Sequence, residues 1–549
     1  MSQFIEKYRD QILGTISGFD RVVFRATPRR LNNIRWDPGR GIFVAKGMQE
    51  YLWQNGIRFK NFGEYVQQVS ARVKEACLEP FRKQQLPVEY IWDPQLDKEK
   101  RARELAAKHK IDGGLICALS AMEMSPTFEY RKSQIACRKR PCQVIYAYQK
   151  HAELGFMYAR IQTWFPFHIQ VGINGREWLA RQMDRASIGY RQQQNCFTYI
   201  EDYTRAQQLL KEQLKSDWPA LLEGFGRQLN PLHEELFERF PSANYWTCFQ
   251  CEWATDVIFR EAEFLKRLMG ILVPHAALSF KCSDILRYFG KRVQASGEVP
   301  EGFARKLQSN LKEYREGQRV KFWLESNSLK FYDKAYTEGG SVLRAGETMT
   351  QKVSIFQAYR PKEGGAPDDL AWRKMRQGIA DLHRRAEISQ KVNDRLMDAL
   401  ASADDDQKLQ ELIAVVQQPA QWNKRRVRAL QPLGQDYALL AAVNRGELMI
   451  RGVRNRDLQA ILYGETAQTP QEQKRRSGAI SRKIRMLRAH GILRKVSGTH
   501  RYHVTSEART MIAAVLSAAR TSLQQINQLT ERNQEGQRPK AKQAKGKAA

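Results

Sequence analysis

The feature of this sequence that most constrains its fold is a helical repeat of apolar residues near the C-terminus. Ile480, Ile484 and Leu487 recur at the i, i+4, i+7 spacing that turns one face of a helix onto a small core. Because successive helical residues are rotated by about 100°, basic side chains and one glycine gather on the opposite face. These are Arg475, Gly478, Arg482 and Arg485. The pattern predicts a helix over about residues 471–490 with one buried and one basic face.

Shorter elements flank this helix. A first helix begins where Asp436 can cap it, and a second covers about Arg456 to Tyr463 and ends at Gly464. After the basic helix come a predicted strand over residues 492–496, a turn at Ser497 and Gly498, and a strand over residues 500–505. Helix, helix, basic helix and hairpin, in that order, are what a winged helix-turn-helix requires.

The run RAHGILRKVSGTHRYHVT, residues 488–505, resembles the end of the recognition helix and the wing of MarR-like winged-helix regulators. The resemblance covers residues 431–515 and implies binding to duplex DNA. Long donors on such a helix contact bases, and wing residues contact phosphates. The predicted DNA-binding residues are Lys474, Arg475, Arg476, Gly478, Ser481, Arg482, Arg485, Arg488, Lys495, Gly498, His500 and Arg501. The alternative is a solvated helix face beside a hairpin that docks protein or RNA.

The distribution of charge favours a polyanionic partner. The 549 residues include 90 Lys and Arg against 59 Asp and Glu, a formal net charge of +31. Residues 421–549 hold 26 basic and 8 acidic side chains, so this segment alone carries +18. The last residues, 531–549, have no apolar content beyond alanine and predict a disordered basic tail.

The predicted fold class is α+β multidomain, with an N-terminal α/β region, a helical middle and the C-terminal winged helix. Residues 1–175 form the α/β region, where successive strand patterns over residues 115–173 predict a mostly antiparallel sheet. Residues 176–360 predict a helical and mixed α+β domain. The Pro- and Gly-rich run PKEGGAPDD at 361–369 predicts a linker, followed by a long polar helix from about Trp372 to Leu400. We expect residues 361–430 to be linker and helix, 431–515 the winged helix, and 516–549 a helix end and the tail.

Several classes of protein find no support in the sequence. It has no GxxxxGK[ST], HExxH or GxSxG motif, which weakens ATPase, zinc-protease and serine-hydrolase hypotheses. Eight scattered cysteines indicate reduced thiols, and the CxxC of Cys248 and Cys251 has no second pair at zinc-finger distance. The N-terminus is charged from Glu6 onward and apolar runs are short, so we expect a cytoplasmic protein without a membrane span.

A second local resemblance raises an enzymatic alternative. The segment NSLKFYDKAYTEGGSVLR, residues 327–344, resembles the LKxYDK…LR signature of phage and plasmid replication initiation factors. In that family a glutamate follows the arginine closely, and here Glu347 stands displaced. Rolling-circle initiators use a metal-binding histidine pair and a tyrosine nucleophile. The nearest matches are His168 and Tyr190, without a second histidine; a packed core histidine is the alternative for His168.

A group of aspartates is a second candidate for a site that cleaves DNA. Asp20 on the first predicted strand, with Asp202, Asp256 or Asp333, would form a metal-dependent nuclease site if the fold brought them together. The alternative is that these residues cap helices and form ion pairs, with Asp202 just before a helix and Asp256 within one. The catalytic candidates are therefore Tyr190, His168, Asp20 and Asp333, with Mg²⁺ or Mn²⁺ required only if this hypothesis holds and no other cofactor expected.

Across its length the chain resembles a family of long, uncharacterised bacterial proteins that join an N-terminal α/β region to a C-terminal winged helix. The residues that carry the resemblance are GFDRVVFR at 18–25, QTWFPF at 162–167, NGREWL at 174–179, YDK at 332–334 and KVSGT at 495–499. It implies no particular activity. The leading hypothesis is a duplex-DNA-binding regulator or mobile-element protein, able to oligomerise; the alternatives are a metal-dependent nickase, nuclease or replication initiator, and a protein that binds RNA or single-stranded DNA.

Overall fold

The computed structural model describes residues 1–32, 35–36, 41–291, 293, 299, 306–314, 317–335, 341–351, 355–362, 365–403, 409–445, 448, 452–465 and 467–520. The chain divides into two compact units. Unit 1 comprises Met1–Met269, Leu286–Ser296 and Pro300–Ala401. Unit 2 comprises Gly270–Ile285, Gly297–Val299 and Ser402–Ala549.

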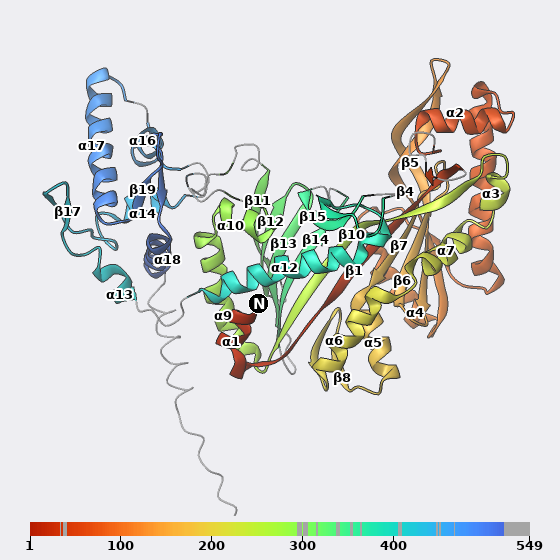
Figure 1. Ribbon diagram of the computed structural model, residues 1–549, viewed down its shortest axis with the longest axis horizontal. Helices are drawn as coiled ribbons and strands as arrows, with labels where there is room; N and C mark the ends of the chain where they lie inside the picture. The colour runs from red at the N-terminus through yellow and green to blue at the C-terminus, as the bar shows by residue number, and fades with distance from the viewer. Residues whose placement is uncertain are drawn as a thin grey trace, which may run out of the picture. The chain divides into compact units, whose positions relative to one another are not determined.

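Unit 1 is built on one large sheet, whose strands run side by side in Figure 1. In the described part of the chain it has twelve strands, in the order β11-β12-β13-β14-β10-β1-β7-β6-β5-β4-β3, with β2 beside β1. Neighbouring strands are antiparallel except the parallel pair β3 and β4. The strands are β1 (Ile12–Asn32), β2 (Arg35–Trp36), β3 (Val88–Tyr90), β4 (Gly114–Arg131), β5 (Gln134–His151), β6 (Gly155–Gln162), β7 (Ile169–Asn174), β10 (Ser242–Phe259), β11 (Leu307–Tyr314), β12 (Gly317–Leu324), β13 (Asn327–Ala335) and β14 (Ser341–Met349).

Several helices and the β8–β9 hairpin contact this sheet. The helix α12 lies against β10 and β14, and α5 and α6 lie against β1. The helices within unit 1 are α1 (Ser2–Lys7), α2 (Ala45–Gln54), α3 (Phe62–Lys83), α4 (Lys98–Lys108), α5 (Gly175–Arg185), α6 (Tyr203–Glu212), α7 (Trp218–Leu229), α8 (His233–Leu236) and α12 (Leu382–Ala401). Residues of α9 (Ala262–Ser279) and α10 (Cys282–Tyr288) are divided between the two units. The hairpins are β8 (Tyr190–Gln193) with β9 (Cys196–Ile200), and β15 (Gln357–Pro361) with β16 (Leu370–Lys374).

Local sequence explains where several of these helices begin. The Asn174 side chain accepts hydrogen bonds from the backbone N–H groups of Arg176 and Glu177, which caps α5. Position 175 requires glycine, because α5 starts directly against β1. A Cβ at this position would lie 1.8 Å from the Phe19 carbonyl oxygen. This contact joins the NGREWL and GFDRVVFR segments, and it places Arg176 beside the centre of the sheet.

Unit 2 has its own core and a different architecture. Its elements are α13 (Leu409–Ala414), β17 (Ala420–Trp422), β18 (Arg425–Val427), α14 (Tyr437–Val443), α16 (Asn455–Tyr463), α17 (Pro470–Ala489), β19 (Leu493–Lys495), β20 (Tyr502–Val504) and α18 (Ser506–Arg520). Side chains of these elements form one hydrophobic cluster that includes Ile480, Ile484 and Leu487 of α17. The buried face predicted for this helix is therefore confirmed.

Three expectations about the middle of the chain are wrong. The run at 361–369 leads from β15 to β16, two strands that pair with one another, so it is not a linker between domains. Trp372 lies in β16, and the long helix starts ten residues later, at Leu382. Residues 176–360 contain both helices and strands, and two of these strands, β10 and β14, lie at the centre of the sheet. Asp256 belongs to β10 and not to a helix.

Among the helices of the described residues, none is both long and apolar enough to cross a membrane. The predicted tail, residues 531–549, lies outside the residues that the structure describes.

Candidate functional site

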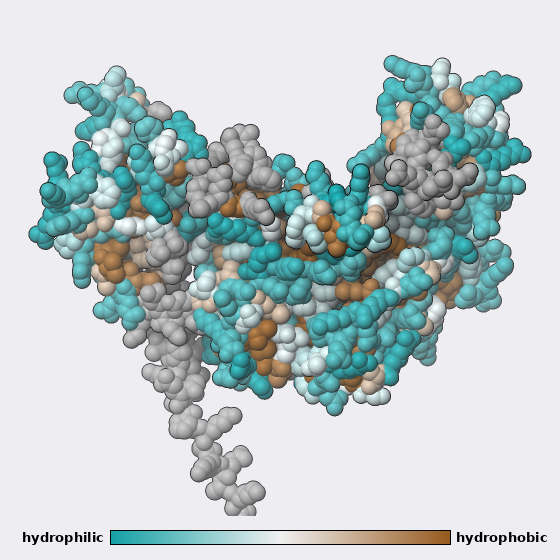
Figure 2. Space-filling view, viewed as in Figure 1, coloured by the Kyte–Doolittle hydropathy of each residue, from teal (hydrophilic) through white to brown (hydrophobic). Residues whose placement is uncertain are grey.

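The basic residues predicted to bind DNA gather in unit 2, mostly on α17 and the β19–β20 hairpin. Lys474, Arg475, Ser481, Arg482 and Arg485 are exposed. Figure 2 shows hydrophilic residues over α17. Lys495, Gly498 and His500 are exposed on the hairpin, while Arg488 and Arg501 are partly buried. The helix thus presents charge on one side and packs its apolar residues on the other, as the sequence predicted.

A cleft lies between α17, the start of α16 and the β19–β20 hairpin. Its volume is about 730 Å³, and its lining includes five arginines and one histidine: Arg454, Arg456, Arg485, Arg488, Arg501 and His500. Ser481, Asn455, Thr499 and the aromatic residues Trp422 and Tyr502 complete most of the wall. No aspartate or glutamate is among the lining residues of the described chain. Such a surface attracts an anion and offers it hydrogen-bond donors.

Specific contacts hold the walls of this cleft in place. The Asn455 side chain donates to the Ser477 carbonyl (2.9 Å) and to Ser481 Oγ (2.8 Å), which fixes the start of α16 against α17. Val453 and Tyr502 exchange backbone hydrogen bonds of 2.7 and 2.9 Å, so a segment before α16 pairs with the hairpin. Arg488 lies over the Trp422 ring at 4.5 Å and near the Tyr502 ring at 5.6 Å.

Two residues of this region have contacts that the sequence did not indicate. Arg476 pairs with Glu472 (2.6 Å) and donates to the Glu465 carbonyl (2.7 Å), so its guanidinium is engaged within the unit. Asp436 precedes α14 without capping it, because its carboxylate binds Arg428 at 2.6 and 2.8 Å. This pair anchors the segment after β18 and lowers the pKa of Asp436, although burial acts in the opposite direction.

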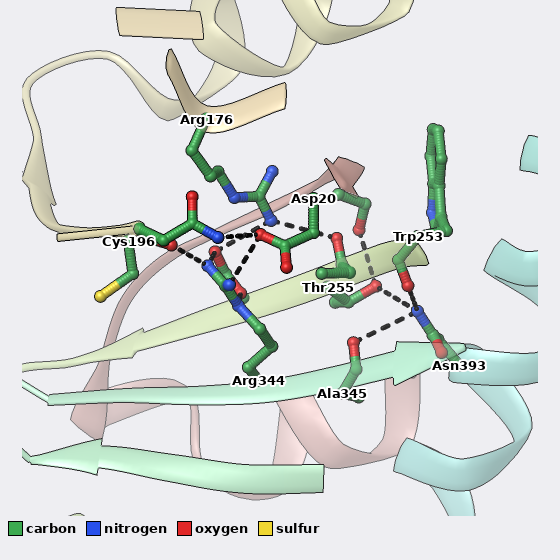
Figure 3. Close-up of polar contacts among 12 residues, drawn as sticks. Asp20, Arg176, Cys196, Trp253, Thr255, Arg344, Ala345 and Asn393 are labelled. Carbon is green, nitrogen blue, oxygen red and sulfur yellow. Dashed lines mark hydrogen bonds and ion pairs between the residues drawn. The ribbon is translucent and has the colours of Figure 1, made fainter. Parts of the chain in front are cut away.

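Two of the carboxylate candidates of unit 1, Asp20 and Asp256, meet at Arg344. Figure 3 shows Asp20 and Arg176 beside this arginine. Arg344 of β14 donates to Asp256 (2.5 and 2.8 Å), to Asp20 Oδ1 (2.8 Å) and to the Asn195 carbonyl (2.7 Å). Arg176 pairs with Asp256 at 2.9 Å, and the Asn195 amide donates to Asp20 at 2.6 Å. Asp20 is the extra residue of a β-bulge, because the register passes from Phe19 opposite Trp253 to Arg21 opposite Glu252.

This buried cluster is neutral in total, since two arginines balance two aspartates. Arg344, Asp256 and Arg176 are each 0% exposed and Asp20 is 4% exposed. Burial opposes ionisation of Asp20, yet Arg344 and Arg176 hold its pKa below the ordinary value. The expected convergence of Asp20 and Asp256 therefore occurs, and the cation between them is a guanidinium. Such a fully paired network orders the centre of the sheet.

The other catalytic candidates are held apart by different partners. Asp333 accepts from the Gln318 backbone N–H (2.5 Å) beside Gly317, where a Cβ would lie 2.1 Å from Oδ1. Tyr190 donates to Asp184 (2.8 Å), and burial raises its pKa to about 12. His168 Nδ1 lies 2.8 Å from Thr27 Oγ1, and burial, helped by Arg25, lowers its pKa to about 3. A neutral phenol and a neutral imidazole result at physiological pH.

Asp202 caps α6 by accepting from the Arg205 backbone N–H at 2.9 Å, which is the structural role considered for it from the sequence. Cys248 and Cys251 are buried free thiols on β10. Among the described residues, no group of three or more His, Cys, Asp or Glu side chains has the geometry to hold a metal ion.

Comparisons with known proteins place this chain in no family. No family model matches it, and no curated protein matches its sequence. Among solved structures, it is matched to a crystal structure of the di-domain ARO/CYC BexL from the BE-7585A biosynthetic pathway, at 8% identity. The match covers 56% of this chain and 94% of that one, with a TM-score of 0.13, which is too low to carry an argument about fold or function.

Proposed function

We propose that unit 2 contains a winged-helix module that binds duplex DNA, with α17 as the recognition helix and β19–β20 as the wing. The observation that carries the proposal is the cleft whose described lining contains five arginines, one histidine and no carboxylate. Because duplex DNA is a dense line of phosphates, a surface of this charge binds it and releases counterions.

The arrangement of elements supports a winged helix specifically. The order α14, α16, α17, β19, β20 matches the motif, and an isolated antiparallel bridge joins Val453 to Tyr502 of the hairpin. Ile480 and Leu487 are fully buried, while Arg482 and Arg485 point away from the core. A helix anchored on one side and carrying long donors on the other suits the major groove.

Within this proposal, the chain is a DNA-binding regulator or a component of mobile-element machinery, and both need such a module. The rival, a metal-dependent nickase or replication initiator, has weaker support in unit 1. Asp20 and Asp256 are neutralised by Arg344 and Arg176, and Tyr190 and His168 bind different partners.

One experiment separates binding from cleavage. The purified full chain is incubated with supercoiled, linear and single-stranded DNA, with and without Mg²⁺ or Mn²⁺, and each lane is scored for mobility shift and for strand breaks. We expect linear duplex to shift in both conditions and to remain intact. A shift confined to single-stranded DNA would overturn the proposal, and metal-dependent nicking would favour the rival.

A further inference from the structure

A row of polar side chains crosses one face of the sheet of unit 1, away from the buried cluster of Arg344. Arg25 of β1 is opposite Gln170 of β7, and Gln170 is opposite Arg160 of β6. Residues paired across neighbouring strands project to the same face, so the three side chains share it. Strands lie about 4.8 Å apart, which places the two arginine Cα atoms about 10 Å from one another. Their guanidinium groups can reach a ligand above Gln170.

The charges in this row are not balanced. Arg160 pairs with Glu123 at 2.8 Å, and the same carboxylate also faces Lys98 at 3.6 Å and accepts from the Tyr146 hydroxyl. The single carboxylate of Glu123 thus pairs with two cations, Arg160 and Lys98. Arg25 forms no ion pair with a described residue and stacks over the Phe249 ring at 3.7 Å. Burial, together with the charge of Arg160, lowers the pKa of Arg25 to about 10.

Two N–H donors on this face of the sheet also lack a hydrogen-bond acceptor. Nε of Arg25 and Nε of Arg160 are buried and have no hydrogen-bond partner among the described residues, and Arg160 is only 6% exposed. A buried, unsatisfied donor on a charged group costs free energy, so native structures retain it where a ligand or water completes it. Arg25, Gln170 and Thr27 are partly exposed, which leaves this face open to a ligand from solvent.

We propose that Arg25, Arg160 and Gln170 form a binding site for a phosphate group on this face of the sheet. In the register Gln170 lies between the two arginines, so two guanidinium groups and one side-chain amide share this face, a set of donors that suits a tetrahedral anion with several acceptor oxygens. The anion supplies the missing negative charge and accepts from both Nε–H groups. His168, neutral and fixed on Thr27, borders the site without adding charge. The inference concerns unit 1 and does not depend on DNA binding by unit 2.

The phosphate can be free, carried on a nucleotide or part of a single strand, and calorimetry of the full chain distinguishes these sources. The probes are inorganic phosphate, adenosine 5′-monophosphate and a short oligothymidylate, with acetate as the carboxylate control at matched ionic strength. The titrations use the Arg482→Ala, Arg485→Ala background, which weakens nucleic-acid binding by unit 2. Equal affinity for all three phosphates assigns free phosphate, and tighter binding of a nucleotide or the oligothymidylate assigns that carrier.

Two substitutions test the residues. Arg25→Gln and Arg160→Gln each weaken phosphate binding at least about tenfold, because each removes a charged donor. Arg21→Gln is the matched control: Arg21 lies on the same strand, is 61% exposed and pairs with Glu99 at 3.8 Å. It leaves binding unchanged. If Arg25→Gln does not fold, Arg25→Lys keeps the charge, loses the two-pronged donor and weakens binding in the same direction.

Thermal unfolding adds a readout that a purely structural arginine would not produce. Without phosphate, Arg25→Gln unfolds at the same or a higher temperature than the parent, because repulsion from Arg160 is removed. Added phosphate raises the unfolding temperature of the parent and not that of the variant. The proposal is overturned if none of the phosphate probes binds, if acetate binds as tightly as phosphate, or if Arg25→Gln binds phosphate with unchanged affinity.

Discussion

In unit 1, Arg344 is fully buried and pairs with two carboxylates, whereas in unit 2 Arg482 and Arg485 are exposed and form no ion pair with any described residue. Arginine therefore has a different role in each unit. A buried arginine with matched carboxylates holds strands together, and it is costly to change. An exposed arginine without a carboxylate contributes little to folding and remains available to a partner. Basic side chains that have no carboxylate partner are therefore the better candidates for binding a ligand.

The largest effect is expected from Arg344→Met. This substitution leaves Asp20 and Asp256 buried with Arg176 as their remaining partner, and removing one member of a buried pair costs about 3–5 kcal/mol of unfolding free energy. All tryptophans except Trp422 belong to unit 1, so tryptophan fluorescence in a urea titration reports this unit. Arg482→Met is the control, followed by far-ultraviolet circular dichroism because Arg482 lies in unit 2, and it should change stability by less than about 0.5 kcal/mol. Equal effects of the two substitutions would remove the distinction between the units.

A smaller and pH-dependent effect is expected at Glu347, which is buried beside Ser389 in unit 1. Burial raises the pKa of this carboxyl well above its ordinary value of 4.5. The unfolded chain then ionises first as pH rises, so this group lowers stability progressively above pH 4.5. Glu347→Gln should remove that loss, so the variant should be more stable than the wild type at pH 8, with the difference shrinking toward pH 4.5. Urea titrations at several pH values test this, and a destabilised variant at pH 8 would show that Glu347 is ionised in the fold.

Arg476 allows paired and unpaired arginines to be compared within one helix, because it lies on α17 and its guanidinium pairs with Glu472. Arg476→Ala breaks the pair with Glu472 and the bond to the Glu465 carbonyl, and it should cost about 0.5–1 kcal/mol of stability. Its effect on DNA affinity should be smaller than that of Arg485→Ala. Thermal unfolding and a binding titration on the same preparations measure both. A larger loss of affinity from Arg476→Ala than from Arg485→Ala would place the DNA nearer the start of α17.

The smallest effect is expected at Tyr190. Its phenol donates to Asp184, and with a pKa of about 12 it remains protonated at neutral pH, so it is a poor nucleophile. We predict no protein–DNA adduct after incubation with Mg²⁺ or Mn²⁺ and denaturing electrophoresis, for the wild-type chain and for Tyr190→Phe alike. An adduct present in the wild type and absent in the variant would establish the initiator hypothesis in place of the binding one.

Elements with a strong period could be predicted from the sequence. The apolar face of α17, the end of α16 at Gly464 and the β19–β20 hairpin appear where their patterns place them. The central strand β10 was not predicted, because a strand buried on both faces lacks the alternation that distinguishes it from a buried helix. The Pro and Gly composition of the run at 361–369 predicts a linker, and the connection between two paired strands has the same composition, so the sequence does not distinguish them.

The contacts of the sites depend on long-range pairing that local patterns do not reveal. Arg344 is 324 residues from Asp20 and 88 from Asp256, and a bulge in β1 positions Asp20. The sequence could therefore name the two aspartates and could not supply the arginine between them. In the same way, Arg25, Gln170 and Arg160 become neighbours only through the register of three strands.

The central claim is that exposed arginines of α17 bind duplex DNA, and fluorescence anisotropy of the full chain on a labelled duplex tests it most directly. The comparison is between wild type, Arg482→Ala with Arg485→Ala, and Arg72→Ala with Arg82→Ala, two arginines of α3 that are about half exposed and paired with Glu235 and Glu75. We predict a loss of about 1–3 kcal/mol of binding free energy for each arginine removed from α17 and none for the α3 pair. Single-stranded RNA should compete poorly. Unchanged affinity of the α17 variant, or RNA that competes as well as the duplex, would contradict the claim.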